Sequence, residues 1–270
     1  MKNIKFLEEK GVNIQNSLEL FGDLDTYNET IGDFLVGIHT KINQLIKFME
    51  ANDMTNYAIV VHSMKSDAKY FGFMDLANMA FEHEEKSKEG DISYISSHIN
   101  NLISETNKAI ILIQEYMNGE DAEKASNGLE VSESDTLGAK TILVVDDSNI
   151  IRSYVKRIFN ESYNVALAND GEEAIRIIKA NANNDMIDAI LLDLNMPKVD
   201  GFAVLEYMRQ NNLLKKMPVS IISGDSSKET IDKAFTYDIV DMVEKPFNES
   251  SIKMVVEKTL YVKNMNQGNE

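Results

Sequence analysis

The pattern of hydrophobic and polar residues changes character near residue 140. Before that point, apolar residues recur every three or four positions over long stretches without proline, as is typical of amphipathic helices. Short polar turns separate these stretches and require antiparallel neighbours, so we expect an all-α, up-down helical bundle within residues 1–118. The pattern predicts helices over residues 26–50, 54–70, 74–88 and 92–117.

After residue 139, short β-branched runs alternate with amphipathic segments, a pattern that favours a parallel sheet covered by helices. The runs occupy residues 141–145, 189–192, 219–222 and 239–244. We expect this α/β domain to span residues 139–264. Residues 119–138 are acidic and poor in large apolar residues, which predicts a flexible linker. Residues 265–270 are expected to form a polar tail.

Polar side chains follow each of the four runs. Asp146 and Asp147 come after the first, Asp193 after the second, Ser223 after the third and Lys245 after the fourth. Ligands of open α/β sheets bind beyond the carboxyl ends of the strands, so these groups are expected to gather at one point.

This set of groups suits phosphoryl chemistry. Crowded carboxylates repel one another, and Mg²⁺ relieves that conflict by taking oxygen ligands. The metal, the Lys245 ammonium and the Ser223 hydroxyl can share the charge of a phosphoryl group. Asp193 stands alone after its strand and is the candidate nucleophile. The competing interpretation is that an aspartate after a strand merely caps the next helix.

The motifs around these residues resemble those of a known family, the receiver domain of two-component response regulators. They are Val144-Val145-Asp146-Asp147, Leu192-Asp193-Leu194-Asn195-Met196-Pro197, Asp200-Gly201, Ser223 and Lys245-Pro246-Phe247. The resemblance implies a doubly wound, flavodoxin-like (βα)5 fold with a parallel five-stranded sheet.

The same resemblance implies roles for individual residues. Asp193 would be the phosphoacceptor, with Mg²⁺ held by Asp146, Asp147, Asp193 and the main-chain carbonyl of Asn195. Ser223 and Lys245 would contact the phosphoryl group, and the Lys245-Pro246 peptide would be cis. Positions at the rim are occupied by Asn195 and Asp225, which would tune access of the hydrolytic water. Met242 stands where receivers usually carry a switch aromatic, so an aromatic switch is in doubt.

A second chemical signal lies in the predicted helix 54–70. At about 100° per residue, His62 points away from the apolar stripe and shares a surface with Lys65, Ser66 and Lys69. We expect a solvated imidazole beside two ammonium groups, which suits acceptance of a phosphoryl group. The alternative is a histidine satisfied inside the core. The apolar stripe comprises Tyr57, Val60, Val61, Met64, Ala68 and Phe71.

The sequence Val61-His62-Ser63-Met64-Lys65-Ser66, followed by Phe71-Gly72, resembles the histidine-phosphotransfer (HPt) family. The resemblance covers residues 11–117, and Ser66 replaces that family's usual glycine. It implies that His62 is a phosphoacceptor. His39, His83 and His98 show no metal-site spacing, and His83 is expected on a solvated helix face.

Composition narrows the functional classes. Acidic residues outnumber basic ones by 44 to 27, for a net charge of −17, which argues against nucleic-acid binding. There is no cysteine, no secretion-signal pattern and no apolar stretch of membrane-spanning length, so we expect a cytoplasmic protein without membrane insertion. No Gly-rich ATP loop occurs, so no kinase catalytic domain is expected.

The expected function is a phosphorelay between phosphohistidine at His62 and phosphoaspartate at Asp193 or in a partner receiver. Expected partners are a sensor histidine kinase or its receiver domain, and other response regulators or a downstream target protein, with output by protein contact. Such a protein is not a classical enzyme, although its receiver promotes its own Mg²⁺-dependent phosphorylation and dephosphorylation. Two alternatives remain: an adaptor with a vestigial phosphoacceptor, and an aspartyl-phosphate phosphatase. The phosphatase's Asp-x-Asp pattern is not matched by Asp146-Asp147-Ser148.

Overall fold

The computed structural model describes residues 4–118, 140–182 and 186–267. The chain forms two compact units, residues 1–135 and 136–270. The linker predicted over residues 119–138 and the end of the predicted polar tail lie outside the described residues. Within the described ranges, no helix is both long enough and apolar enough to cross a membrane.

The described part of the first unit is helical, and all four predicted helices are present. The helix predicted over residues 26–50 begins earlier, at Leu24, and the helix predicted over residues 92–117 ends one residue later, at Asn118. Two short helices precede them. The elements are α1 (Ile4–Glu9), α2 (Ile14–Phe21), α3 (Leu24–Glu50), α4 (Met54–Tyr70), α5 (Met74–Lys88) and α6 (Ile92–Asn118).

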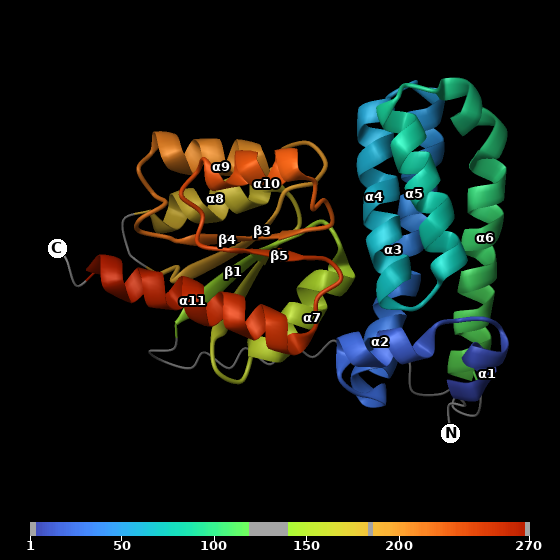
Figure 1. Cartoon of the computed structure of the whole chain (residues 1–270), viewed down its shortest axis with the longest axis horizontal. Coiled ribbons are helices and arrows are strands. Elements are labelled where there is room, and N and C mark those ends of the chain that lie inside the picture. Colours follow the sequence, from blue (N-terminus) through green and yellow to red (C-terminus); the bar gives the residue numbers. More distant parts are fainter. Residues whose placement is uncertain (1–3, 119–139, 183–185, 268–270) are drawn as a thin grey trace. The chain divides into compact units, whose positions relative to one another are not determined.

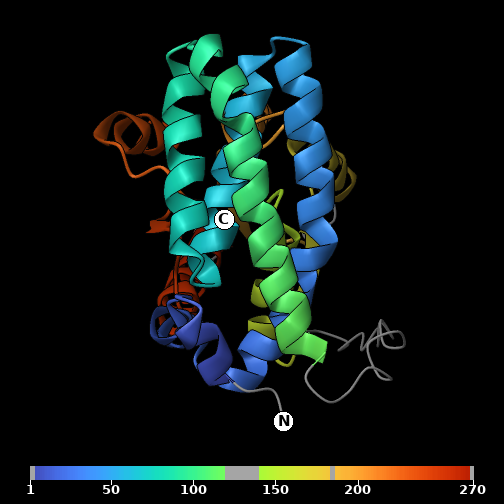
Figure 2. The same ribbon diagram turned by 90° about the vertical axis from the view of Figure 1, so that its right-hand side faces the viewer.

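The four long helices pack side by side as a bundle, with α1 and α2 at one end (Figure 2). Helix α4 packs against both α3 and α5, and α6 closes the bundle by packing against α5 and α3. Aspartates begin two of these helices: Asp23 accepts a hydrogen bond from Thr26 N (2.7 Å) and Asp53 from Asn56 N (3.1 Å). Such side chains satisfy amide groups that lack a partner within the helix.

An aromatic cluster fixes the end of the bundle where α1 and α2 lie. Phe71 is at its centre, with ring centroids 5.3 Å from Phe21, 5.7 Å from Tyr27 and 5.6 Å from Phe34. Next to it, Gly72 adopts a φ of 79°, and a Cβ there would lie 2.5 Å from the Asn13 carbonyl oxygen. Glycine is therefore required where the α1–α2 connection meets the α4–α5 turn.

The second unit is a flavodoxin-like α/β domain with a five-stranded parallel sheet in the order β2-β1-β3-β4-β5. Helices α7 and α11 cover one face, and α8, α9 and α10 cover the other (Figure 1). The elements are β1 (Thr141–Val145), α7 (Asn149–Phe159), β2 (Asn164–Ala168), α8 (Gly171–Asn181), β3 (Ala189–Asp193), α9 (Gly201–Gln210), β4 (Val219–Ser223), α10 (Lys228–Phe235), β5 (Met242–Glu244) and α11 (Glu249–Gln267).

The two edge strands differ from the sequence pattern in a way that burial explains. The central strands β3 and β4 are buried along their full length, as their continuous apolar runs predict. Edge strand β2 is mostly half-buried, and its short run Val165-Ala166-Leu167-Ala168 was not among the four predicted strands. At the opposite edge, β5 takes only three residues of the run predicted over 239–244.

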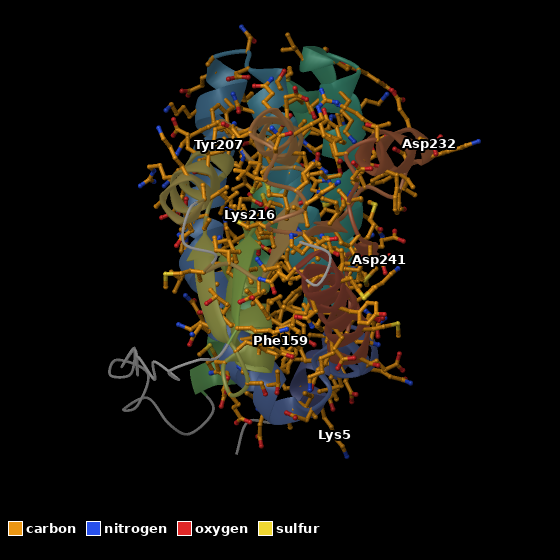
Figure 3. The ribbon with its side chains drawn as sticks, turned by 90° about the vertical axis from the view of Figure 1, so that its left-hand side faces the viewer. Lys5, Phe159, Tyr207, Lys216, Asp232 and Asp241 are labelled. Atoms are coloured by element: carbon orange, nitrogen blue, oxygen red, sulfur yellow. The ribbon has the colours of Figure 1, made fainter. Side chains whose placement is uncertain are left out.

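Helix α11 is tied to the rest of its unit by two lysines. Lys263 Nζ donates to the Lys216 carbonyl oxygen (2.6 Å), and Lys258 Nζ lies 2.8 Å from Asp241 Oδ2. Figure 3 labels Lys216 and Asp241. The helix continues to Gln267, so the first three residues of the segment predicted as a polar tail are helical.

Candidate functional site

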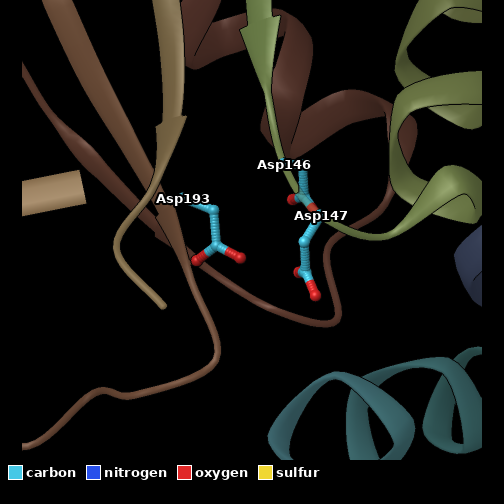
Figure 4. A group of neighbouring side chains, drawn as sticks. All are labelled: Asp146, Asp147 and Asp193. Atoms are coloured by element: carbon cyan, nitrogen blue, oxygen red, sulfur yellow. The ribbon is translucent and has the colours of Figure 1, made fainter. Parts of the chain in front are cut away.

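Three carboxylates meet at the carboxyl ends of adjacent strands. Strand β1 ends immediately before Asp146 and Asp147, strand β3 ends at Asp193, and the two strands pair in parallel. Each of the three aspartates offers an oxygen atom within 4.8 Å of those of the other two (Figure 4). The structure therefore brings together the three carboxylates that the sequence pattern placed at strand ends.

These aspartates do not cap the helices that follow. Ser148 caps α7, Asp200 caps α9 and Ser227 caps α10, each by accepting a hydrogen bond from an amide of the first turn. The capping interpretation of Asp147 and Asp193 is therefore wrong. Gly201 allows the loop after β3 to fold tightly onto its own strand, because a Cβ there would lie 2.2 Å from the Asp193 carbonyl oxygen.

Lys245 supplies the positive charge of the cluster. Its peptide with Pro246 is cis, as predicted. Its Nζ lies 2.7 Å from Asp193 Oδ2 and 2.7 Å from Asp146 Oδ2. Burial alone would lower the pKa of Lys245, but the charges of Asp146 and then Asp193 outweigh it and hold this pKa above the usual range. Lys245 is therefore charged at neutral pH.

One ammonium does not compensate three carboxylates. Burial raises the pKa of Asp146 to about 7, with Lys245 opposing and Asp193 and Asp147 adding to the rise. Its Oδ2 accepts no well-aligned hydrogen bond from any described residue, although Lys245 lies nearby. A cluster rich in oxygen ligands, with more negative than positive charge, suits a divalent cation.

The remaining predicted groups surround this cluster. Ser223 ends β4, and its Oγ accepts a hydrogen bond from Asp225 N (3.1 Å). The Asp225 carboxylate accepts from Ser227 N (2.9 Å) and Thr230 Oγ1 (2.8 Å), so it also organises the start of α10. The main-chain N–H of the partly exposed Asn195 donates to Asp193 Oδ1 (3.2 Å).

Met242, the other position singled out beside the site, opens β5 and is partly exposed. It pairs with Ile221 across the sheet. The side chain at this position therefore lies on the edge strand, two strands away from Asp193.

The environment of His62 differs from the prediction. We expected a solvated imidazole, but His62 Nδ1 lies 2.8 Å from Glu84 Oε1 on α5. Lys65 Nζ donates to the other oxygen of the same carboxylate (2.6 Å), and Lys88 Nζ approaches Oε1 (2.7 Å). The prediction of a solvated ring beside exposed lysines is wrong, because α4 packs directly against α5 at this point and buries both His62 and Lys65. The structure agrees with the alternative, a histidine satisfied inside the core.

Glu84 is the functional candidate that the sequence pattern missed. Burial alone would raise its pKa, but the hydrogen bond and charge of His62, followed by Lys65, hold this pKa well below the usual range. Glu84 is thus an ionised acceptor for the ring. The signal was present in the spacing, because positions 76, 77, 80, 83, 84 and 87 form one buried helical stripe.

His83 was expected on a solvated helix face, and this is also wrong. Its side chain is buried, and its Nδ1 lies 2.8 Å from the Tyr57 hydroxyl. Burial, and secondarily the charge of His98, lower the pKa of His83 to about 4, so the ring is neutral at pH 7.

The other side of α4 carries a second cation. Lys41 on α3 donates to Ser63 Oγ (2.7 Å) and to Asp67 Oδ2. Ser63 directly follows His62 in α4, so Lys41 binds the residue next to this histidine. Of the other predicted neighbours, Ser66 is buried and Lys69 partly exposed.

Comparison with known proteins identifies the second unit. Residues 142–257 match the response regulator receiver domain family. The two-component response regulator ARR2 of Arabidopsis thaliana is 32% identical over 139 residues, or 51% of this chain and 20% of that protein. The autoinducer 1 sensor kinase/phosphatase LuxN of Vibrio harveyi is 31% identical over 46% of this chain and 14% of that protein. This chain therefore spans a fifth or less of the length of these two relatives.

Among solved structures, the chemotaxis protein CheY4 of Vibrio cholerae is 28% identical, with a TM-score of 0.41. The match covers 45% of this chain and 99% of that one. The family match and the strand order together show that the C-terminal unit is a response regulator receiver domain of two-component signalling.

Proposed function

We propose that the chain is a phosphorelay protein in which a histidine-phosphotransfer bundle with phosphoacceptor His62 precedes a receiver with phosphoacceptor Asp193. The observation that carries the proposal is the pairing of each acceptor with a fixed ionic partner. Asp193 contacts the Lys245 ammonium, and His62 contacts the Glu84 carboxylate. Lys245 would stabilise the phosphoryl group on Asp193, and Glu84 would orient the His62 ring as a nucleophile.

At the receiver, an Asp193 oxygen attacks the phosphorus of the incoming group and the donor's bond to phosphorus breaks. Lys245 and Ser223 then bind phosphoryl oxygens. Asp146, Asp147, Asp193 and the main-chain carbonyl of Asn195 would hold Mg²⁺, which when bound neutralises part of the phosphoryl charge. Lys245 stays charged through the cycle, because its carboxylate neighbours stabilise the ammonium form.

At the bundle, Glu84 fixes the tautomer of His62. An ionised carboxylate beside Nδ1 holds the proton on that nitrogen, so the lone pair resides on Nε2. Nε2 attacks the phosphorus of the Asp193 acyl phosphate, a nitrogen–phosphorus bond forms, and the aspartate oxygen leaves as carboxylate. Both phosphorylated residues are activated species, so transfer in either direction is chemically accessible.

The proposed partners follow from this chemistry. A sensor histidine kinase or its receiver domain supplies the phosphoryl group, and another response regulator or a target protein receives the signal through protein contact. The similarity to a sensor kinase/phosphatase is confined to a segment the length of a receiver domain. We propose the cytoplasm as the location and Mg²⁺ as the cofactor.

The proposal is tested with three full-length proteins: wild type, His62→Ala and Asp193→Asn. Each receives acetyl phosphate and Mg²⁺, and base-labile acyl phosphate is separated from base-stable phosphohistidine. We expect both species in wild type, acyl phosphate alone in His62→Ala, and neither when Asp193 is replaced. Base-stable label in His62→Ala contradicts the assignment of His62.

Mixing the two variants tests transfer between molecules. Phosphorylated His62→Ala is freed of donor and added to Asp193→Asn, which is expected to gain phosphohistidine. Wild type followed over a dilution series separates the routes, since internal transfer does not depend on concentration. An adaptor with a vestigial acceptor predicts instead that one of the two phosphorylated species never forms.

A further inference from the structure

Three side chains hold the Glu84 carboxylate, and one of them lies at the surface. Lys65 Nζ donates to Glu84 Oε2 (2.6 Å). His62 Nδ1 and Lys88 Nζ both contact Oε1, at 2.8 Å and 2.7 Å. Lys65 is buried, whereas the Lys88 side chain is 52% exposed. Lys88 is therefore bound to the same oxygen atom as the histidine ring, although it lies on α5, outside the sequence motif around His62.

We propose that Lys88 is a positioning residue of the His62 site, which fixes the plane of the Glu84 carboxylate so that Oε1 stays against the ring. This inference rests on the proposed function, because the ring that Glu84 orients is the proposed phosphoacceptor. Lys88 has no contact with the phosphoryl group in this proposal and acts only through Glu84.

The torsional freedom of a glutamate side chain explains why a second ammonium is needed. The terminal torsion of glutamate is broad and roughly two-fold, so a carboxylate held at one oxygen can still turn. Lys65 holds Oε2. Lys88 holds Oε1, and the two contacts together define the plane in which the ring meets its acceptor. Position 88 suits this task, because residues four apart on a helix are neighbours.

The charge of Lys88 is available for this contact. Burial alone would lower the pKa of Lys88, but the hydrogen bond and charge of Glu84 outweigh it and hold this pKa above its usual range. Lys88 is therefore charged at neutral pH. A cation beside a buried carboxylate favours the ionised form, which is the form that accepts a hydrogen bond from Nδ1.

The alternative is that Lys88 serves only its own helix. It is the last residue of α5, where a cation offsets the helix dipole, and Glu–Lys pairs four residues apart are favourable on any helix surface. Lys86 separates the two interpretations, because it lies in the same last turn but pairs with Glu89 (2.6 Å). A role in the helix alone predicts equal effects of Lys86→Gln and Lys88→Gln.

The experiment uses full-length Lys88→Gln, Lys88→Arg, Lys86→Gln, Glu84→Ala and the double variant Glu84→Ala/Lys88→Gln. The rate of phosphohistidine formation is measured with acetyl phosphate and Mg²⁺, beside the thermal unfolding midpoint. The tautomer of the unphosphorylated His62 ring is read from the ¹⁵N NMR shifts of its two nitrogens, at about pH 8, above the ordinary pKa of histidine. Signals that are missing in His62→Ala assign the ring.

Lys88→Gln should slow phosphohistidine formation by about two- to fivefold, the range for an ion pair screened by solvent. It should also shift the ring from the Nδ1–H tautomer toward a mixture of the two. Lys88→Arg should retain the rate and the tautomer, because it keeps the charge, and Lys86→Gln should change neither. In the Glu84→Ala background, Lys88→Gln should have no further effect.

Unchanged rate and tautomer in Lys88→Gln overturn the proposal, as do equal losses in Lys88→Gln and Lys86→Gln or a further loss in the double variant. A faster rate or a larger share of the Nδ1–H tautomer also overturns it, because Lys88 would then compete with the ring for Oε1.

If Glu84→Ala fails to fold, the tautomer in Lys88→Gln and its recovery in Lys88→Arg still decide. Failure of the proposed function has a different signature. Wild type then forms no phosphohistidine, while the tautomer of the His62 ring still reports whether Lys88 positions Glu84.

Discussion

The two candidate sites are built on opposite principles. In the receiver unit, the three aspartates, Ser223 and Lys245 lie at the end of a strand or just after it, and the parallel sheet brings those ends together. In the bundle, His62 lies in the middle of a 17-residue helix. Its partner Glu84 comes from α5, so the site depends on how α4 and α5 pack side by side.

This difference determines how each site tolerates change. The receiver's charges are concentrated, with one buried ammonium bridging two carboxylates at 2.7 Å each, so loss of one group leaves a buried charge without its partner. The bundle's charges are distributed over separate lysine–carboxylate pairs on the two sides of α4. We therefore expect complete loss of function when Asp193 is changed, and graded losses when the ionic partners of His62 are changed.

The largest expected effect is at Asp193. Asp193→Asn removes the oxygen nucleophile, so acetyl phosphate with Mg²⁺ should give no acid-stable, base-labile label. Chelation of the metal should produce the same loss in wild type. Without a cation, one ammonium cannot offset the negative charge of three carboxylates, which would then repel the incoming phosphoryl group. The measurement is mass and base lability of the adduct.

The matched control for Asp193→Asn is Asp200→Asn, which changes the carboxylate that caps α9 in the same β3–α9 region. Asparagine is also a good N-cap, so this variant should still label. Persistent base-labile label in Asp193→Asn contradicts the assignment of the phosphoacceptor.

A graded loss is expected when Glu84 is replaced. Glu84→Ala removes the acceptor for both His62 and Lys65, so phosphohistidine formation should slow by about 10- to 100-fold, as for loss of a charge-assisted hydrogen bond. Glu85→Ala is the control, because Glu85 is the next residue, half exposed, and paired only loosely with Lys88 at 3.4 Å. Equal rates in the two variants would show that Glu84 does not orient the ring.

The neighbouring residues His83, Glu84 and Glu85 show how far the sequence could lead. The helix over 74–88 was predicted with its observed bounds, but the charged run within it was interpreted as a solvated face. Charge suggested exposure, whereas the spacing from Leu76 and Ala77 put His83 and Glu84 on the buried stripe. A partner for a buried charge comes from another helix, and local sequence does not identify that helix.

The receiver was predictable in more detail because its topology constrains it. Once parallel strands are predicted, the positions after Val145, Leu192 and Ile222 must share one edge of the sheet. Glu84 had no equivalent constraint, since α4 packs against both α3 and α5 and either helix could have faced His62. The roles of the receiver residues remain proposals that the labelling experiments test.

A smaller effect concerns stability rather than transfer. His83 has a folded pKa of about 4, below its ordinary value, because burial disfavours the charged ring. Between that value and the unfolded pKa near 6.5, the unfolded chain binds more protons, so stability falls as the pH is lowered. Acidification from about pH 7 to about pH 5 should cost the bundle about 2 kcal/mol through this residue.

His83→Gln should remove that part of the pH dependence, measured by urea unfolding of the full-length protein at the two pH values. His39→Gln is the control, since His39 is an exposed histidine on another helix, α3. An unchanged pH dependence in His83→Gln would show that the buried ring remains neutral in the unfolded chain or charged in the folded one.

The smallest expected effect is at the rim of the receiver site, where we expect side chains to control how fast the phosphoryl group is hydrolysed. Asn195 is partly exposed beside Asp193, whereas the Asp225 carboxylate is bound to Ser227 and Thr230. A bulky or basic side chain at either position should obstruct the hydrolytic water and slow dephosphorylation, by about two- to tenfold for a change in access alone. Asn195→Lys should act mainly on lifetime, while Asp225→Lys should also loosen the start of α10.

Half-lives are measured after removal of the donor in a His62→Ala background, which prevents transfer to the bundle. Gln210→Lys, at the last residue of α9, adds the same charge away from the rim and should leave the half-life unchanged. If Asn195→Lys and Gln210→Lys give equal half-lives, Asn195 does not limit access of water, and the strand-end groups alone determine the lifetime.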